Sequence, residues 1–238
     1  MSGQSFDDRH RQERAYAEHK GPPRPQTPRT ASAVYFDLET GGIEDTHPDI
    51  QLAAVAIDEG TWTELGSFEA KVAFDPQEAD PSALALNHYT PEAWAGAESL
   101  AIVVAKFAGF LERFRSLSMV SKRTGKPYSV AKLVGHNAAT FDGPRLRRMF
   151  EKCDRFLPAD PRVRCTCQRA MWWFDERGIA PKDFKLATLC EHFGIAADGA
   201  HDALADVRLT VLLSRELDPC WPRREIADRH ALAEGVDR

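Results

Sequence analysis

Long hydrophobic runs are absent from this sequence of 238 residues. Its most apolar stretch, 100–104, is followed closely by Lys106, whereas a membrane span requires about 20 predominantly apolar residues. The first residues are polar and charged and contain no secretory signal. We therefore expect no membrane segment and a location in the cytoplasm.

Cysteine is scarce, and its five residues are an odd number that does not suggest a disulfide framework. Cys165 and Cys167 form a C-x-C pair without a matching second half of a structural zinc site. Reduced thiols, which are usual in the cytosol, are the simpler interpretation.

A basic excess is also lacking, because 31 Lys and Arg face 36 Asp and Glu, for a formal net charge of −5. If the partner is nucleic acid, it must be bound through local contacts or through metal ions. With 43% hydrophobic and 28% charged residues, the composition is that of a soluble globular protein with one main domain.

The two ends of the chain differ from its middle. Residues 1–30 contain four prolines and no Leu, Ile or Val, so we expect a disordered, Pro-rich N-terminal arm. Residues 218–238 contain two prolines and a short charged segment, and form a C-terminal extension to which we assign no role. The expected domain is 31–217.

The middle of the chain alternates between strand and helix patterns. Strands are expected at 33–39, at 51–57 and near 62–74, with a turn at 58–60, which makes an antiparallel meander of three. This order predicts an α/β fold with a mixed sheet and helices on its faces. The remaining expected elements are two strands, 130–134 and 163–166, and three helices, 100–114, a segment from Asp142 and 203–217.

Polar residues lie at the ends of these elements. Asp37 and Glu39 end the first strand and share one face, because strand residues alternate. Asp142 follows the fourth strand, and His201 and Asp206 begin the last helix. Each alone is explained equally well as a loop or helix cap. Together they are expected to meet at the carboxyl ends of the strands, where ligands bind in α/β sheets.

Four carboxylates in one cleft repel one another. Two unit charges ~4 Å apart cost on the order of 4 kcal/mol at an effective dielectric of ~20. Bound cations remove this cost, and oxygen ligands suit Mg²⁺ or Mn²⁺. Two such ions form the clamp that stabilises both oxygens of a phosphodiester displacement.

Three segments, FDLETGG, GHNAATFD and HDALAD, in this order resemble the exonuclease motifs of the DEDDh 3′→5′ exonucleases. These belong to the DnaQ-like superfamily, and the resemblance extends over about 33–217. It implies an RNase H-like, mixed five-stranded sheet: the antiparallel meander plus parallel strands, with helices on both faces. The spacing of the second motif is closest to TREX-like members. The resemblance assigns two Mg²⁺ or Mn²⁺ to Asp37, Glu39, Asp142 and Asp206, and the role of general base to His201.

Neighbouring residues are expected to bind substrate. Thr40 and Gly41 would offer backbone N–H groups to the sugar of the terminal nucleotide. Asn137 would bind through hydrogen bonds, and Phe141 would pack near a base or, preferably, in the core. Three arginines of the next helix either reach phosphates or form a solvated basic face: Arg145, Arg147 and Arg148.

The resemblance implies a metal-dependent 3′→5′ exonuclease that releases 5′-mononucleotides from a 3′ end, with single-stranded DNA favoured. Alternatives are an exoribonuclease of the same group, an inactive module that binds nucleic acid, and an RNase H-like endonuclease. DNA repair, proofreading with a polymerase, and a homodimer are further expectations. The segment 121–128, SKRTGKPY, is a basic loop before the fourth strand and has no assigned role.

Overall fold

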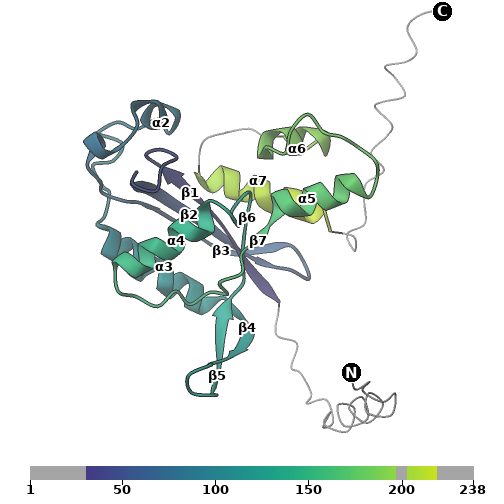
Figure 1. Cartoon of the computed structure of the whole chain (residues 1–238), viewed down its shortest axis with the longest axis horizontal. Helices are drawn as coiled ribbons and strands as arrows, with labels where there is room; N and C mark the ends of the chain where they lie inside the picture. Colours follow the sequence, from purple (N-terminus) through teal and green to yellow (C-terminus); the bar gives the residue numbers. More distant parts are fainter. Residues whose placement is uncertain (1–30, 197–202, 219–238) are drawn as a thin grey trace, which may run out of the picture.

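The computed structural model describes residues 31–196 and 203–218 (Figure 1). The expected N-terminal arm, His201 and almost all of the C-terminal extension lie outside these residues. Within the described ranges, no helix is long and apolar enough to cross a membrane.

A mixed five-stranded sheet forms the centre of the domain, in the order β3-β2-β1-β6-β7. The first three strands pair antiparallel, and β6 and β7 run parallel to β1. The expected RNase H-like α/β architecture is therefore confirmed. The strands are β1 (Ser32–Thr40), β2 (Asp49–Asp58), β3 (Thr63–Lys71), β6 (Leu133–Gly135) and β7 (Arg164–Cys165).

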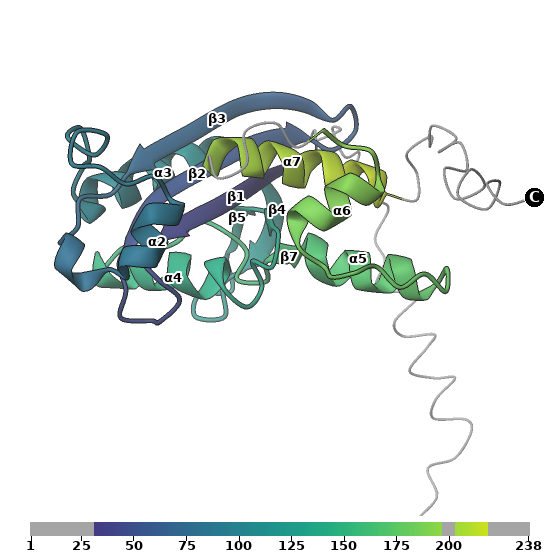
Figure 2. The same cartoon turned by 90° about the horizontal axis from the view of Figure 1, so that it is seen from above.

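Alternation along β1 supplies two cores. Val34, Phe36 and Leu38 point into the larger core, beneath α3 and α4, whereas Ala33 and Tyr35 pack against α7 on the other face. Helix α7 lies across β1 and β2 (Figure 2). The helices are α2 (Pro81–Leu86), α3 (Leu100–Arg113), α4 (Asp142–Lys152), α5 (Thr166–Asp175), α6 (Leu186–His192) and α7 (Ala203–Glu216), with a short η1 (Pro76–Glu78).

The strand expected at 130–134 is wrong as a single element. Residues up to Ala131 belong to β5 (Pro127–Ala131), which pairs with β4 (Arg115–Val120) in a separate two-stranded sheet. Only the residues after Lys132 join the main sheet, as β6 beside β1. The segment is apolar on both sides of Lys132 and carries no period of two, so it cannot show where the chain passes from one sheet to another.

The expected strand at 163–166 is shorter than the pattern suggested. It contributes only the two residues of β7, and α5 begins directly at Thr166. This brief strand still pairs parallel with β6, so the topology of the sheet is as expected.

Candidate active site

Strand β1 places Asp37 and Glu39 at its carboxyl end, on the face that α7 covers. Both side chains are half-buried, while Leu38 between them points into the opposite core. Their partners across the β1–β2 ladder are Ala53 and Gln51. The alternation expected from the sequence is therefore present, with two carboxylates side by side.

Asp142 reaches the same region as the first residue of α4. Its side chain is only 4% exposed and accepts hydrogen bonds from its own backbone N–H and from that of Leu38 on β1. Burial nevertheless raises the pKa of Asp142 to about 7. The bond from Leu38 ties the start of α4 to the strand that carries Asp37 and Glu39.

Asp206 comes from the first turn of α7 and is half-buried. Its position is set by Ala203 and Val207, which are buried against the sheet. The pKa of Asp37 is raised well above its ordinary value, first by burial and then by the charges of Asp142, Glu39 and Asp206. Four carboxylates from three separate segments thus share one electrostatic environment.

The chemistry of these donors fits a hard divalent cation. Carboxylate oxygens are the ligands that Mg²⁺ and Mn²⁺ prefer, and a cation would cancel the repulsion that raises the pKa of Asp37. Among residues 31–196 and 203–218, however, no group of three or more His, Cys, Asp or Glu side chains is arranged to hold a metal ion. The expected base, His201, lies outside these residues.

Thr40 and Gly41 lie beside the acids but are already hydrogen-bonded. The Thr40 hydroxyl donates to the Gly42 carbonyl at 2.9 Å, and the Gly41 N–H donates to the Pro48 carbonyl at 2.7 Å. The Gly41 N–H is therefore engaged within the loop, and a contact of Thr40 or Gly41 with the sugar stays a prediction. Close packing explains this glycine, since a Cβ there would lie 2.8 Å from that of Ala79.

The turn between β6 and α4 carries the other two expected substrate residues. Asn137 is exposed, with a φ of 55°, and its side-chain oxygen accepts a hydrogen bond from Thr140 at 3.1 Å. Phe141 is half-buried and belongs to none of the apolar cores; its ring lies 4.8 Å from the guanidinium carbon of Arg145. The preferred expectation of core packing is wrong for Phe141.

Arg145 is neither a phosphate contact nor part of a solvated face, as its side chain is only 2% exposed. Its guanidinium donates to the Asp49 carboxylate at 3.1 Å and to four backbone carbonyls of the β1–β2 loop. The carbonyls belong to Gly42, Ile43, Glu44 and His47, at 2.6–3.3 Å. One buried cation therefore holds the loop that follows Glu39.

The helical spacing of α4 contains the signal that sequence reasoning missed. Arg145 lies three residues after the buried Asp142 and four before the buried Met149, which places it on the inward face of the helix. Arg148, by contrast, pairs with the exposed Asp45 at 2.7 Å. Arg147 is exposed and donates to the Pro161 carbonyl at 3.2 Å.

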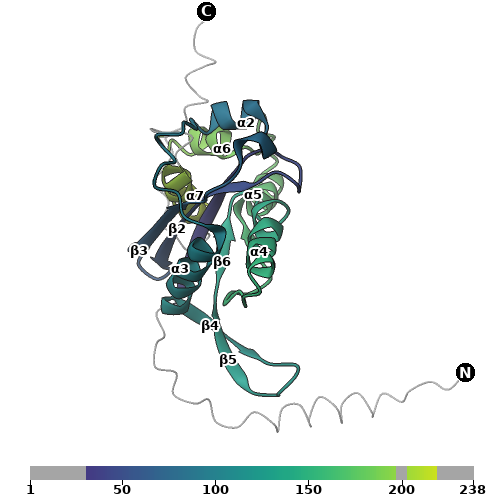
Figure 3. The same ribbon diagram turned by 90° about the vertical axis from the view of Figure 1, so that its left-hand side faces the viewer.

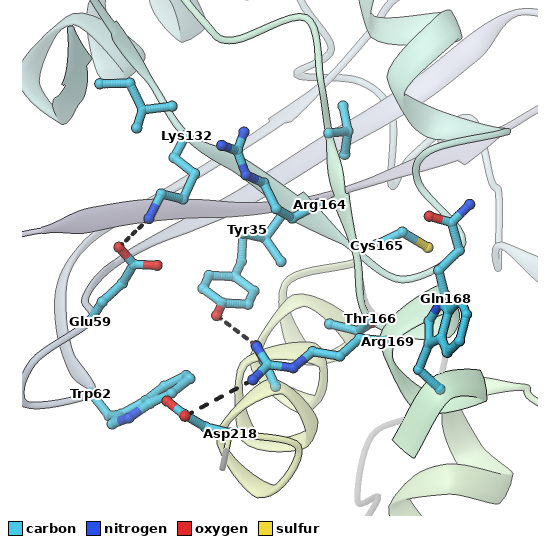
Figure 4. Close-up of a pocket in the computed structure, with 15 residues that line it drawn as sticks. Tyr35, Glu59, Trp62, Lys132, Arg164, Cys165, Thr166, Gln168, Arg169 and Asp218 are labelled. Carbon is cyan, nitrogen blue, oxygen red and sulfur yellow. Dashed lines mark hydrogen bonds and ion pairs between the residues drawn. The ribbon is translucent and has the colours of Figure 1, made fainter. Parts of the chain in front are cut away.

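A separate cavity of about 640 Å³ opens near the start of β1 (Figure 4). Its described lining contains none of the four acids. Tyr35 donates to Ser214 at 2.9 Å inside it, and Trp62 and Trp172 are among its walls. Its cations are paired, Lys132 with Glu59, Arg169 with Asp218 and Arg164 with Asp160. The cavity is thus distinct from the acid cluster.

No protein-family model matches the chain, and no curated protein is similar to it in sequence. Solved structures are similar in three dimensions. One structure of exonuclease I superposes with a TM-score of 0.59 at 21% sequence identity, over 79% of this chain and 40% of that chain. The described domain is therefore similar in fold to the matched part of exonuclease I.

Two further structures agree. E. coli exonuclease I in complex with a dT13 oligonucleotide gives a TM-score of 0.58 at 22% identity, over 77% of this chain and 40% of that chain. A product-bound structure of exonuclease I gives a TM-score of 0.59 at 20% identity, over 79% of this chain and 43% of that chain. The chain spans less than half the length of these exonuclease I chains, and the likeness at such identities is one of fold.

Proposed function

We propose that this protein is a metal-dependent exonuclease that hydrolyses single-stranded DNA from the 3′ end to 5′-mononucleotides. The observation that carries the proposal is the shared environment of Asp37, Glu39, Asp142 and Asp206 at the carboxyl end of β1. The fold of exonuclease I, which has been solved with a dT13 oligonucleotide, supports single-stranded DNA as the substrate.

Within this proposal, the four carboxylates hold two Mg²⁺ or Mn²⁺. When bound, the ions supply Lewis acidity at the phosphodiester and neutralise charge on both of its reacting oxygens. His201 takes the proton of the attacking water, because an imidazole with an ordinary pKa near ~6.5 is mostly neutral at pH 7. Thr40, the exposed Asn137 and the half-buried Phe141 are the candidates for contacts to the terminal nucleotide.

We further propose that the chain belongs to the DEDDh group. The spacing of its second motif is closest to that of TREX-like members. The partner is then a nucleic-acid 3′ end in the cytoplasm, and the biological setting is DNA repair or proofreading. Association with a polymerase or with a second copy of the chain belongs to the same proposal. The domain responsible is 31–217, with the flanking 1–30 and 218–238 as extensions.

The test uses a 5′-labelled single-stranded oligodeoxynucleotide with Mg²⁺ or Mn²⁺. We expect a ladder of products shortened one nucleotide at a time from the 3′ end, and its loss in EDTA. Asp206→Asn should abolish the ladder while preserving the helix. Glu64→Gln is the matched control, because Glu64 is exposed and pairs with Arg208 on the outer side of α7.

Two results would refute the exonuclease. Internal cuts without mononucleotides indicate an endonuclease, and binding without hydrolysis indicates an inactive module. RNA of the same sequence, assayed in parallel, decides between DNA and RNA, since that choice depends on contacts to the 2′-OH.

A further inference from the structure

The β4–β5 hairpin projects from the body of the domain (Figures 1 and 3). Residues 115–131 contain four Lys or Arg and no Asp or Glu, in a chain whose formal net charge is −5. Lys122, Arg123 and Lys126 are exposed together in the turn that joins the two strands. The hairpin is therefore a local concentration of positive charge.

Hydrogen bonds hold this turn in a defined shape. The Ser121 N–H donates to the Lys126 carbonyl at 2.9 Å, and the Gly125 N–H donates to the Ser121 carbonyl at 2.8 Å. Gly125 has a φ of 68°, which glycine adopts without strain. The three cations are thus presented by an ordered turn rather than by a loose chain.

Several other cations on the surface are paired, unlike these three. Lys106, Arg148 and Arg208 each pair with a carboxylate, at 2.6, 2.7 and 3.2 Å. Across the part of the chain that the structure describes, no carboxylate lies in ion-pair distance of the three cations of the turn. Their positive potential is therefore available to a polyanion.

Exposed apolar side chains accompany the charge. Tyr128 on β5 and Phe156 after α4 are 37% and 68% exposed, and their rings meet edge to face with centroids 6.5 Å apart. Cations beside exposed aromatic rings are the combination that holds single-stranded nucleic acid, through phosphates and stacked bases respectively. An acidic protein segment would pair with the cations but would gain little from contact with the exposed rings.

The hairpin lies at the opposite end of β1 from the acids. Ser116 on β4 donates to the carbonyl of Ser32, where β1 begins, at 2.6 Å, whereas Glu39 lies near its end. At ~3.3 Å per residue, these two ends of β1 are about 23 Å apart. The turn lies at least six residues beyond Ser116 on the projecting hairpin, so a strand stacked at ~3.4 Å per nucleotide needs at least roughly seven nucleotides to reach it from the acids.

We propose that the β4–β5 hairpin is a second contact for single-stranded nucleic acid, which binds the strand several nucleotides before the 3′ end that enters the acid cluster. The inference rests on the proposed exonuclease function for the identity of the strand. It assigns phosphate contacts to Lys122, Arg123 and Lys126, and base stacking to Tyr128 and Phe156.

The test measures binding without hydrolysis, by fluorescence anisotropy of a 5′-labelled oligodeoxynucleotide in EDTA over a series of salt concentrations. The test variant carries Lys122→Gln, Arg123→Gln and Lys126→Gln together. The control variant carries Lys106→Gln, Arg177→Gln and Arg208→Gln, which remove the same net charge from exposed side chains elsewhere.

For an oligonucleotide of about 20 residues, the test variant should lower the slope of log K against log salt by about 2, since each single-strand phosphate contact contributes about 0.7. The control variant should change the slope much less. For an oligonucleotide of about 5 residues, the two variants should bind alike, because such a strand is too short to lie on both sites.

Phe156→Ala should weaken binding of the longer strand about fivefold by loss of stacking, with no change in the salt slope. The melting temperatures of all variants should lie within about 2 °C of the unsubstituted protein, because the replaced side chains are exposed.

Equal slopes for the test and control variants would overturn the inference. A second pair of results would also overturn it: polyglutamate at matched charge displaces the oligonucleotide, and Phe156→Ala has no effect. These results together would assign the surface to an acidic protein. Failure of the exonuclease itself is a separate result, because the ladder assay detects hydrolysis and this experiment detects binding.

Discussion

A single buried arginine determines the shape of the loop that follows the D-x-E strand. Arg145→Met keeps most of the side-chain volume but leaves the Asp49 carboxylate and four loop carbonyls without their donor. Because breaking a buried ion pair leaves an uncompensated charge, we expect a loss of about 3–5 kcal/mol in the free energy of unfolding, measured by urea denaturation.

Arg147→Met is the matched control, since Arg147 lies on the same helix and is exposed. It should change the free energy of unfolding by less than about 0.5 kcal/mol. Equal effects of the two substitutions would contradict the role of Arg145. Arg145→Lys should fall between them, because an ammonium keeps the charge without the planar fork of donors.

Ionised Asp160 stabilises the folded protein, so the free energy of unfolding depends on pH in the acid range. Its side chain is fully buried; burial raises its pKa, but hydrogen bonds from Arg162 and Arg164 outweigh this and hold the pKa below its ordinary value of 3.8. A carboxyl with a lowered pKa stabilises the folded state above its unfolded pKa, and this contribution disappears as pH falls through the folded pKa.

Asp160→Asn should therefore cost about 1–3 kcal/mol at pH 7 and progressively less below pH ~4. Urea denaturation at pH 7, 5, 4 and 3 measures this difference. Asp45→Asn is the control, because Asp45 is exposed and its pair with Arg148 should contribute less than about 1 kcal/mol at any pH. A constant difference between Asp160→Asn and the unsubstituted protein would contradict this explanation.

At the scale of elements, periodic segments were predicted well and aperiodic ones were not. The alternation of β1 and the helical spacing of α3 fix both type and orientation, because each has a polar face and an apolar face. The run around Lys132 has no such alternation, so the sequence did not reveal that β5 and β6 belong to different sheets. The β4–β5 hairpin could not be predicted either, because the pairing of β5 with β4 is visible only in the tertiary structure.

Helix α7 should depend on Leu213 more than on its neighbour Leu212. Leu213 is fully buried and joins α7 to α5 and α6, whereas Leu212 is half-buried and outside the apolar cores. We expect Leu213→Ala to cost about 2–5 kcal/mol of unfolding free energy and Leu212→Ala clearly less, by urea denaturation. A larger loss of unfolding free energy for Leu212→Ala than for Leu213→Ala would contradict the packing of α7 against α5 and α6.

For the whole molecule, the arrangement of the acids was more predictable than that of the residues supporting them. Asp37, Glu39, Asp142 and Asp206 occur in short motifs at element ends, where local pattern and topology suffice to bring them together. The contacts of Arg145 join residues about a hundred positions apart in the sequence. No local pattern encodes such a partner, and the bonding of Gly41 to Pro48 was missed because a loop's internal hydrogen bonds depend on its final shape.

From the proposed metal site, we expect the molecule to be less stable without cations than with them. Burial and the charges of three neighbouring acids raise the pKa of Asp37, so above that pKa the ionised cluster opposes folding. A cation bound only by the folded state adds about 2.7 kcal/mol at a concentration 100 times its Kd. At about 2–4 °C per kcal/mol, Mg²⁺ or Mn²⁺ should raise the melting temperature by roughly 5–10 °C at pH 7.5.

Asp37→Asn distinguishes this effect from a general influence of salt. Asparagine is nearly isosteric and removes one of the crowded charges, so the metal-free variant should be more stable than the metal-free unsubstituted protein, by about 1–3 kcal/mol. It should also lose most of its response to Mg²⁺, whereas Glu64→Gln should retain it, and both are followed by melting curves in EDTA and in Mg²⁺. An Asp37→Asn protein that is less stable in EDTA yet keeps the full Mg²⁺ shift would mean that the cation binds elsewhere, because a ligand to the ion cannot be removed without weakening its hold on the folded state.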